Sequence, residues 1–76
     1  MMQVQVRLFA TFRTGRFSRK TMDLAEGTTL AAVINEVGIP LDEVHLPLVN
    51  GTYQYSLDVV LKDGDVVSAF PKVGGG

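Results

Sequence analysis

One short stretch carries the clearest periodicity in this chain of 76 residues, and it limits the architectures that the chain can adopt. Apolar residues recur there at i, i+3, i+4 and i+7, which is the spacing of one helix face. They are Leu30, Val33, Ile34 and Val37. Thr29, or Thr28 before it, offers a hydroxyl to the free amide groups of the first turn. Gly38 and Pro40 end the stretch, so the pattern predicts a helix from about Leu30 to Val37.

Alternation of apolar and polar residues predicts strands before and after this helix. From Gln3 to Ala10 the even-numbered side chains are apolar and the odd-numbered ones are polar, except for Phe9. A second run, Arg19 to Leu24, directs Met22 and Leu24 to the same face. Two turns, at Asn50-Gly51 and at Lys62 to Asp65, separate the remaining predicted segments, which are Leu46 to Val49, Tyr53 to Tyr55 and Val66 to Phe70.

The order of these elements predicts an α+β fold of the β-grasp (ubiquitin-like) type. The expected sheet is mixed, has four to five strands, and holds the first and last strands side by side under one main helix. A chain this short buries only about 60% of its unfolded surface, so it fits a single domain. We assign residues 1–70 to the β-grasp domain and residues 71–76 to a flexible C-terminal glycine tail.

Composition excludes several classes of function. The net charge is −1, and the one basic cluster, which is Arg13, Arg16, Arg19 and Lys20, is explained better by a solvated hairpin tip than by a docking patch. We therefore expect no nucleic-acid partner. The absence of cysteine removes disulfides, thiolate metal sites and thiol nucleophiles. No apolar run approaches the roughly 20 residues of a membrane span, so we expect no membrane partner and a cytoplasmic location.

The glycine tail is the candidate working part. Its six residues, Pro71 to Gly76, reach at most about 20 Å, and a tip without side chains can enter a channel too narrow for other residues. A frayed terminus is the simpler alternative. A terminal carboxylate is a poor electrophile and needs activation, for example as a mixed anhydride with AMP. Because the chain has no phosphate-binding loop, a partner enzyme must perform that step.

Other candidate chemistry is weak. His45 is the only histidine and has no serine or cysteine nucleophile beside it. Asp63 and Asp65 flank Gly64, where hydrogen bonds to the turn backbone explain them better than a metal does. We assign no catalytic residue and no metal site.

The chain resembles the ThiS/MoaD sulfur carriers over nearly its whole length. The residues that carry the resemblance are Val6 to Ala10, Thr29, Leu48 to Gly51, Leu61 to Asp65 and, most specifically, Ala69 to Gly76. The resemblance implies a carrier rather than an enzyme, with Gly76 as the site of adenylation and of the thiocarboxylate. Gly74 and Gly75 would form the threading arm.

The resemblance also implies the partners. They are a ubiquitin-activating-like adenylyltransferase that uses ATP and magnesium, a sulfur donor such as a cysteine desulfurase relay, and a sulfur-accepting synthase subunit. This chain itself would bind no cofactor. Pro71-Lys72 stands where the molybdopterin branch often has two prolines. The ending favours molybdopterin or tungstopterin synthesis, with thiamine thiazole synthesis next; the alternatives are a ubiquitin-like modifier or a non-activated interaction module.

A partner interface is expected on the open face of the sheet, where complexes of the resembled family place apolar residues. The residues assigned to it are Phe9, Tyr53, Phe70 and Pro71. Phe9 is odd-numbered, whereas Val6 and Leu8 are even-numbered, so its side chain points to the sheet face opposite the helix. Exposed aromatic surface is typical of binding sites. Packing against local loops is the alternative.

Overall fold

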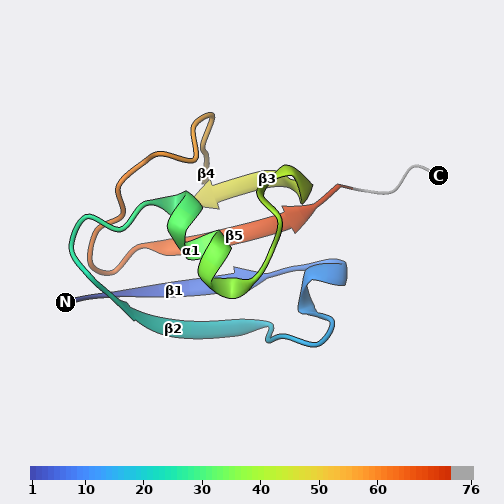
Figure 1. Ribbon diagram of the computed structural model, residues 1–76, viewed down its shortest axis with the longest axis horizontal. Helices are drawn as coiled ribbons and strands as arrows, with labels where there is room; N and C mark the ends of the chain where they lie inside the picture. The colour runs from blue at the N-terminus through green and yellow to red at the C-terminus, as the bar shows by residue number, and fades with distance from the viewer. Residues whose placement is uncertain (73–76) are drawn as a thin grey trace.

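The computed structural model describes residues 1–72. In chain order its elements are β1 (Met2–Leu8), the 3-10 helix η1 (Ala10–Arg13), β2 (Arg19–Leu24), α1 (Leu30–Val37), the 3-10 helix η2 (Leu41–Glu43), β3 (Val44–Val49), β4 (Thr52–Tyr53) and β5 (Val66–Pro71). Figure 1 shows α1 lying across one face of the sheet. No helix in this described part has the length and apolar character needed to cross a membrane.

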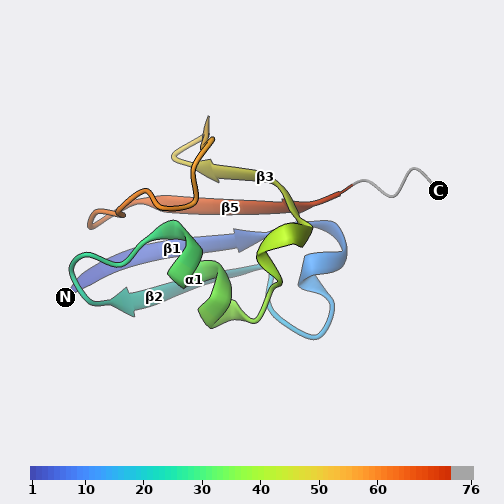
Figure 2. The ribbon, with the colours of Figure 1, turned by 45° about the horizontal axis from the view of Figure 1, so that its top comes forward.

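The sheet has five strands in the order β2-β1-β5-β3-β4. β1 and β5 are neighbours and run parallel, whereas β2, β3 and β4 pair antiparallel with their neighbours. The mixed sheet under one helix confirms the predicted β-grasp fold. Figure 2 shows α1 on one side of the sheet, with the other side uncovered.

The core lies between α1 and the sheet. The inward side chains of β1, which are Met2, Val4, Val6 and Leu8, are all at most 2% exposed. Leu30, Val33 and Ile34 of α1 are buried to the same extent, and Val37 packs against them from a partly buried position. The predicted inward positions of β2 also pack on this core, with Leu24 buried and Met22 half-buried.

The capping residues fix the helix at the predicted bounds. The Thr29 hydroxyl accepts a hydrogen bond from the Ala32 N–H at 3.2 Å, which satisfies a free amide of the first turn. Thr28 has another role, since its hydroxyl donates to the Ala25 carbonyl. Gly38 follows the helix with φ of 91°, a left-handed conformation that glycine adopts without strain.

Some strand ends differ from the prediction. β1 stops at Leu8 rather than at Ala10, because Ala10 has φ of 54° and turns the chain into η1. This turn buries Phe12, at 4% exposed, in a core position that the sequence did not indicate. β4 covers Thr52–Tyr53 only.

β3 and β5 are longer than predicted. β3 already starts at Val44, and β5 continues to Pro71, with Val44 and Pro71 paired across an irregularity in the register. Pro71, which the sequence assigns to the tail, is therefore the last residue of the sheet in the described chain.

Candidate functional site

The end of β5 is the point from which the predicted tail leaves the sheet. Val67 and Ala69 anchor this strand in the core at 1% exposed, and Pro71 closes it. Proline lacks a backbone N–H group and cannot donate a hydrogen bond to a neighbouring strand. It is tolerated here because it lies at the end of the strand. Gly74, Gly75 and Gly76 lie outside the described residues, so their predicted roles stay predictions.

Two of the predicted interface residues form an aromatic stack. The rings of Phe9 and Phe70 are 4.1 Å apart between centroids and inclined by 9°. The parallel register explains this, because Leu8 lies beside Ala69. Phe9 continues the extended backbone one residue beyond β1, so the side chains of Phe9 and Phe70 both point to the opposite face. Both rings are half-buried, and the Arg7 guanidinium lies 5.7 Å from the centre of the Phe9 ring.

The stack borders an apolar hollow at the end of the sheet. Its volume is about 340 Å³, and it is lined by Ala10, Thr11, His45, Leu46, Phe70, Pro71 and Lys72. Leu46 belongs to it because this residue pairs with Phe70 across β3 and β5. The hollow therefore joins the open face to the root of the predicted tail.

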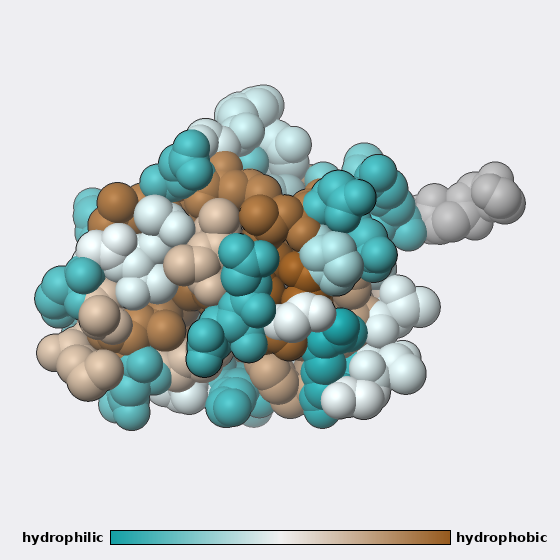
Figure 3. Space-filling view, viewed as in Figure 1, coloured by the Kyte–Doolittle hydropathy of each residue, from teal (hydrophilic) through white to brown (hydrophobic). Residues whose placement is uncertain are grey.

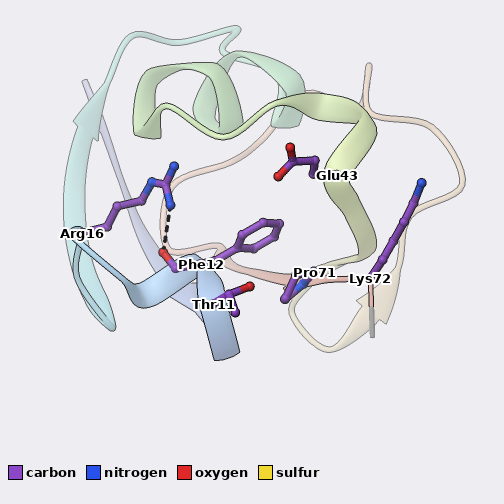
Figure 4. A pocket seen from close by; sticks show the side chains of 6 residues that line it. All are labelled: Thr11, Phe12, Arg16, Glu43, Pro71 and Lys72. Carbon is purple, nitrogen blue, oxygen red and sulfur yellow. Dashed lines mark hydrogen bonds between the residues drawn. The ribbon is translucent and has the colours of Figure 1, made fainter. Parts of the chain in front are cut away.

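A second hollow lies between η1, η2 and the end of β5. It has a volume of about 400 Å³ and is lined by Thr11, Phe12, Arg16, Glu43, Pro71 and Lys72. Figure 4 shows the Phe12 ring and the Glu43 carboxylate in this space, with Arg16 donating to the Phe12 carbonyl oxygen at 3.3 Å. Because Pro71 and Lys72 line both hollows, the strand end has a concave surface on either side.

Tyr53 shares the open face but lies apart from the stack. It pairs with Leu48, which pairs in turn with Ser68, so it sits two strands away from β5. Its side chain is 39% exposed and packs edge-to-face against Tyr55, with ring centroids 4.7 Å apart. The structure thus brings together Phe9, Phe70 and Pro71 and leaves Tyr53 at the side.

The turn carboxylates are structural, as the sequence indicated. Asp63 accepts a hydrogen bond from the Gln3 N–H at 2.8 Å, and Asp65 accepts from the Lys62 N–H at 2.8 Å. His45 is exposed. Within residues 1–72, no group of three histidine, cysteine or acidic side chains is arranged to hold a metal ion.

Sequence reasoning missed several residues of the site. Leu46 and Thr11 line the apolar hollow. The run from Leu46 to Val49 is apolar throughout, so its sequence does not show which side chains point away from the helix. Arg16, placed at a solvated hairpin tip, also donates to the Gly38 carbonyl at 3.0 Å and so holds the loop before β2 against the end of α1.

Comparisons with known proteins agree with this geometry. The family model described as "ThiS family" matches residues 6–76. No curated protein matches the sequence significantly. Among solved structures, a Pyrococcus furiosus protein provisionally described as molybdopterin converting factor subunit 1 is 34% identical, with a TM-score of 0.76, over 93% of this chain and 98% of its own.

Two further structures extend the comparison. One chain of a complex between subunits 1 and 2 of the Helicobacter pylori molybdopterin-converting factor has 28% identity and a TM-score of 0.67, over 99% of this chain and 100% of that one. The Haloferax volcanii small archaeal modifier protein 1 has 17% identity and a TM-score of 0.74, over 93% and 98% of the two chains, and supports the fold alone. The chain belongs to the ThiS family, whose members are small carrier proteins rather than enzymes.

Proposed function

We propose that this chain is a sulfur carrier whose Gly76 carboxylate is activated by a partner enzyme and then carries sulfur as a thiocarboxylate. The observation that carries the proposal is the end of β5. A partly buried strand terminates at Pro71 between two hollows and beside the Phe9–Phe70 stack. The sequence then continues through Lys72 and Val73 into three glycines. A rigid strand followed by residues without side chains suits delivery of a carboxylate into a narrow active site.

The chemistry has three steps, which are activation of the carboxylate, acyl transfer to sulfur, and release of the thiocarboxylate. The Gly76 carboxylate attacks the α-phosphorus of ATP, and pyrophosphate leaves, giving an acyl adenylate. A persulfide sulfur on the donor protein then attacks the acyl carbon and expels AMP. A second thiol of the donor cleaves the S–S bond of this acyl disulfide, forming a protein disulfide and releasing the thiocarboxylate. The carrier supplies the carboxylate and the docking surface, while the adenylyltransferase supplies the ATP and magnesium site.

The proposed destination is molybdopterin or tungstopterin, with thiamine thiazole as the second candidate. The molybdopterin assignment is supported by the descriptions of two relatives, at 34% and 28% identity, which both name the molybdopterin-converting factor. The Helicobacter pylori structure is a complex of subunits 1 and 2. We propose that the open face with Phe9, Phe70 and Pro71 docks an equivalent synthase subunit and the adenylyltransferase in turn, and that Tyr53 lies at the margin of that surface.

Removal of Gly75 and Gly76 tests the activation step. The truncated protein should release no pyrophosphate when mixed with the cognate adenylyltransferase, ATP and magnesium. Its thermal midpoint should equal that of the full chain. Because its docking surface is intact, it should also inhibit activation of the full chain in competition. Pyrophosphate release at the full rate would contradict the proposal and favour an interaction module with an unused tail.

A second arm separates a carrier from a protein modifier, since both need adenylation. Addition of a sulfide donor to the activated chain should give a product of thiocarboxylate mass. Transfer to lysine side chains in the same mixture, without a thiocarboxylate, would instead identify a modifier.

A further inference from the structure

The outer edge of β2 has no neighbouring strand in the described chain. β2 stands at the end of the strand order, and Figure 1 shows no element beyond it. The opposite edge of the sheet offers fewer backbone groups to another strand. β4 has only two residues, and β3 contains Pro47, which lacks an N–H group. β2 is therefore the longer of the two strands that end the sheet, with six residues.

The backbone hydrogen-bond pattern identifies which groups point outward. The Leu8 N–H donates to the Ser18 carbonyl at 3.0 Å, so the even-numbered residues that follow Ser18 face β1. The N–H and C=O groups of Arg19, Thr21 and Asp23 consequently point away from the sheet. None of these groups has a hydrogen-bond partner within residues 1–72. Free backbone groups in such a row form a template for another strand.

Along this edge, arginine side chains precede Thr21 and acidic side chains follow it at the same distances in sequence. Arg19 lies two residues before it and Asp23 two residues after it. Arg16 and Glu26 repeat the arrangement five residues before and after. An antiparallel second copy centred on Thr21 therefore places Arg19 opposite Asp23 twice, once on each side of the two-fold axis.

The same register makes the fullest use of the free backbone groups. Pairing requires outward-facing residues on both copies, so only Arg19, Thr21 and Asp23 can take part. Centred on Thr21, all three find partners, whereas a shift of the partner strand by two residues in either direction leaves one of them unpaired on each copy. Backbone geometry and charge thus select the same register.

Two side-chain features of the single chain fit this arrangement. Arg19 lies directly opposite Arg7 in the β1–β2 pair, and like charges in such positions repel. Asp23 of a second copy would place an opposite charge beside Arg19. On the helix face, Met22 of the second copy would lie opposite Lys20, next to a hollow of about 300 Å³ whose apolar lining includes Phe17 and Val37.

We propose that two copies of this chain associate through antiparallel pairing of their β2 strands, centred on Thr21, to form one continuous sheet. The lower margin of the molecule in Figure 3, over β2, is mainly hydrophilic, so backbone bonds and charge pairs rather than apolar burial hold the copies together. The two-fold axis is perpendicular to the sheet, so both Phe9–Phe70 stacks stay on one open face. β1 separates β5 from the pairing edge, so the proposed docking surface remains uncovered.

Charge exchange at two positions tests the proposal by sedimentation equilibrium. The unmodified chain should show a reversible dimer as its concentration is raised to about 1 mM, the weak end of specific association. Arg19→Asp or Asp23→Arg places like charges in both symmetry-related pairs, so each should weaken the dimer by about tenfold or more. The double exchange, R19D with D23R, should restore it. Asp58→Arg, an exposed charge change away from β2, is the matched control and should leave association unchanged.

Amide resonances give an independent readout. The N–H signals of Arg19, Thr21 and Asp23 should shift with concentration, while those of Lys20 and Met22, which bond to β1, should shift less. A chain that stays monomeric at about 1 mM would overturn the proposal. A dimer that is insensitive to R19D, or that the double exchange fails to restore, would also overturn it. Thermal midpoints close to that of the unmodified chain establish that each variant is folded.

Discussion

Replacement of Phe70 by alanine separates two roles of the aromatic stack. In the free chain, Phe70 packs on Phe9 at 4.1 Å and is half-buried. A fully buried phenylalanine truncated to alanine costs about 3–5 kcal/mol, so half-burial implies a loss of about 2 kcal/mol in the free energy of unfolding. A domain of this size has roughly 4–11 kcal/mol of stability, and the variant should therefore remain folded.

The effect on partner binding should be separate from this loss. An aromatic anchor at the centre of an interface contributes about 2 kcal/mol or more, which corresponds to about 30-fold in Kd. Urea unfolding measures the first quantity, and titration calorimetry against the cognate adenylyltransferase measures the second. Val60→Ala is the matched control, because Val60 is apolar and 53% exposed but lies outside the stack and both hollows. It should change neither quantity by more than about 0.5 kcal/mol.

A double-mutant cycle with Phe9→Ala isolates the stack itself. The coupling free energy in unfolding should be about 0.5–1.5 kcal/mol, the range for aromatic pairs in contact. If Phe70→Ala destabilises the chain as expected but binds the adenylyltransferase as tightly as the unmodified protein, the stack serves internal packing alone. The assignment of Phe9 and Phe70 to the partner interface would then be wrong.

Three other predictions concern the helix and the tail. Ile34→Ala, at a position 2% exposed, should lower the free energy of unfolding in urea by about 2–5 kcal/mol; a loss below about 1 kcal/mol would place α1 on another surface. Thr29→Ala removes the hydroxyl that accepts from Ala32 and should cost about 1 kcal/mol in the same assay, whereas an unchanged midpoint would show that water replaces the cap. Gly75→Val adds a β-branched side chain to the proposed threading arm and should nearly abolish pyrophosphate release without altering thermal stability; normal release would mean that the channel is wider than proposed.

The sequence predicted those parts of the fold whose determinants are local. The helix bounds follow from the apolar stripe together with Thr29 and Gly38, and each of these residues acts within one turn of the helix. The turn at Asn50-Gly51 is equally local, and both residues adopt positive φ there, 52° and 81°. The pairing of β1 with β5 was expected from the order of the elements, which is that of a β-grasp fold.

Features that depend on tertiary contacts were not predictable in this way. Nothing near Ala10 indicates a φ of 54°, since the alternation of β1 continues through this residue. The turn at Ala10 places Phe12 in the core, which is a tertiary contact. Leu46 reaches the open face because β3 takes its register from β5. The alternation of side chains along the first strand was enough to place Phe9 and Leu8 on opposite faces of the sheet. The contact between Phe9 and Phe70 also depends on the register between two strands.

The intact mass of the protein isolated from its native cells tests the proposed function most directly. We predict a population in which one oxygen of the terminal carboxylate of Gly76 is replaced by sulfur. Tandem mass spectrometry should locate the added mass at Gly76, and alkylation of the thiocarboxylate should shift that fraction by the mass of one alkyl group. A chain found only with an unmodified carboxylate, while its adenylyltransferase and sulfur donor are active in the same cells, would contradict the carrier function. A chain found only as conjugates to other proteins would contradict it in favour of a modifier.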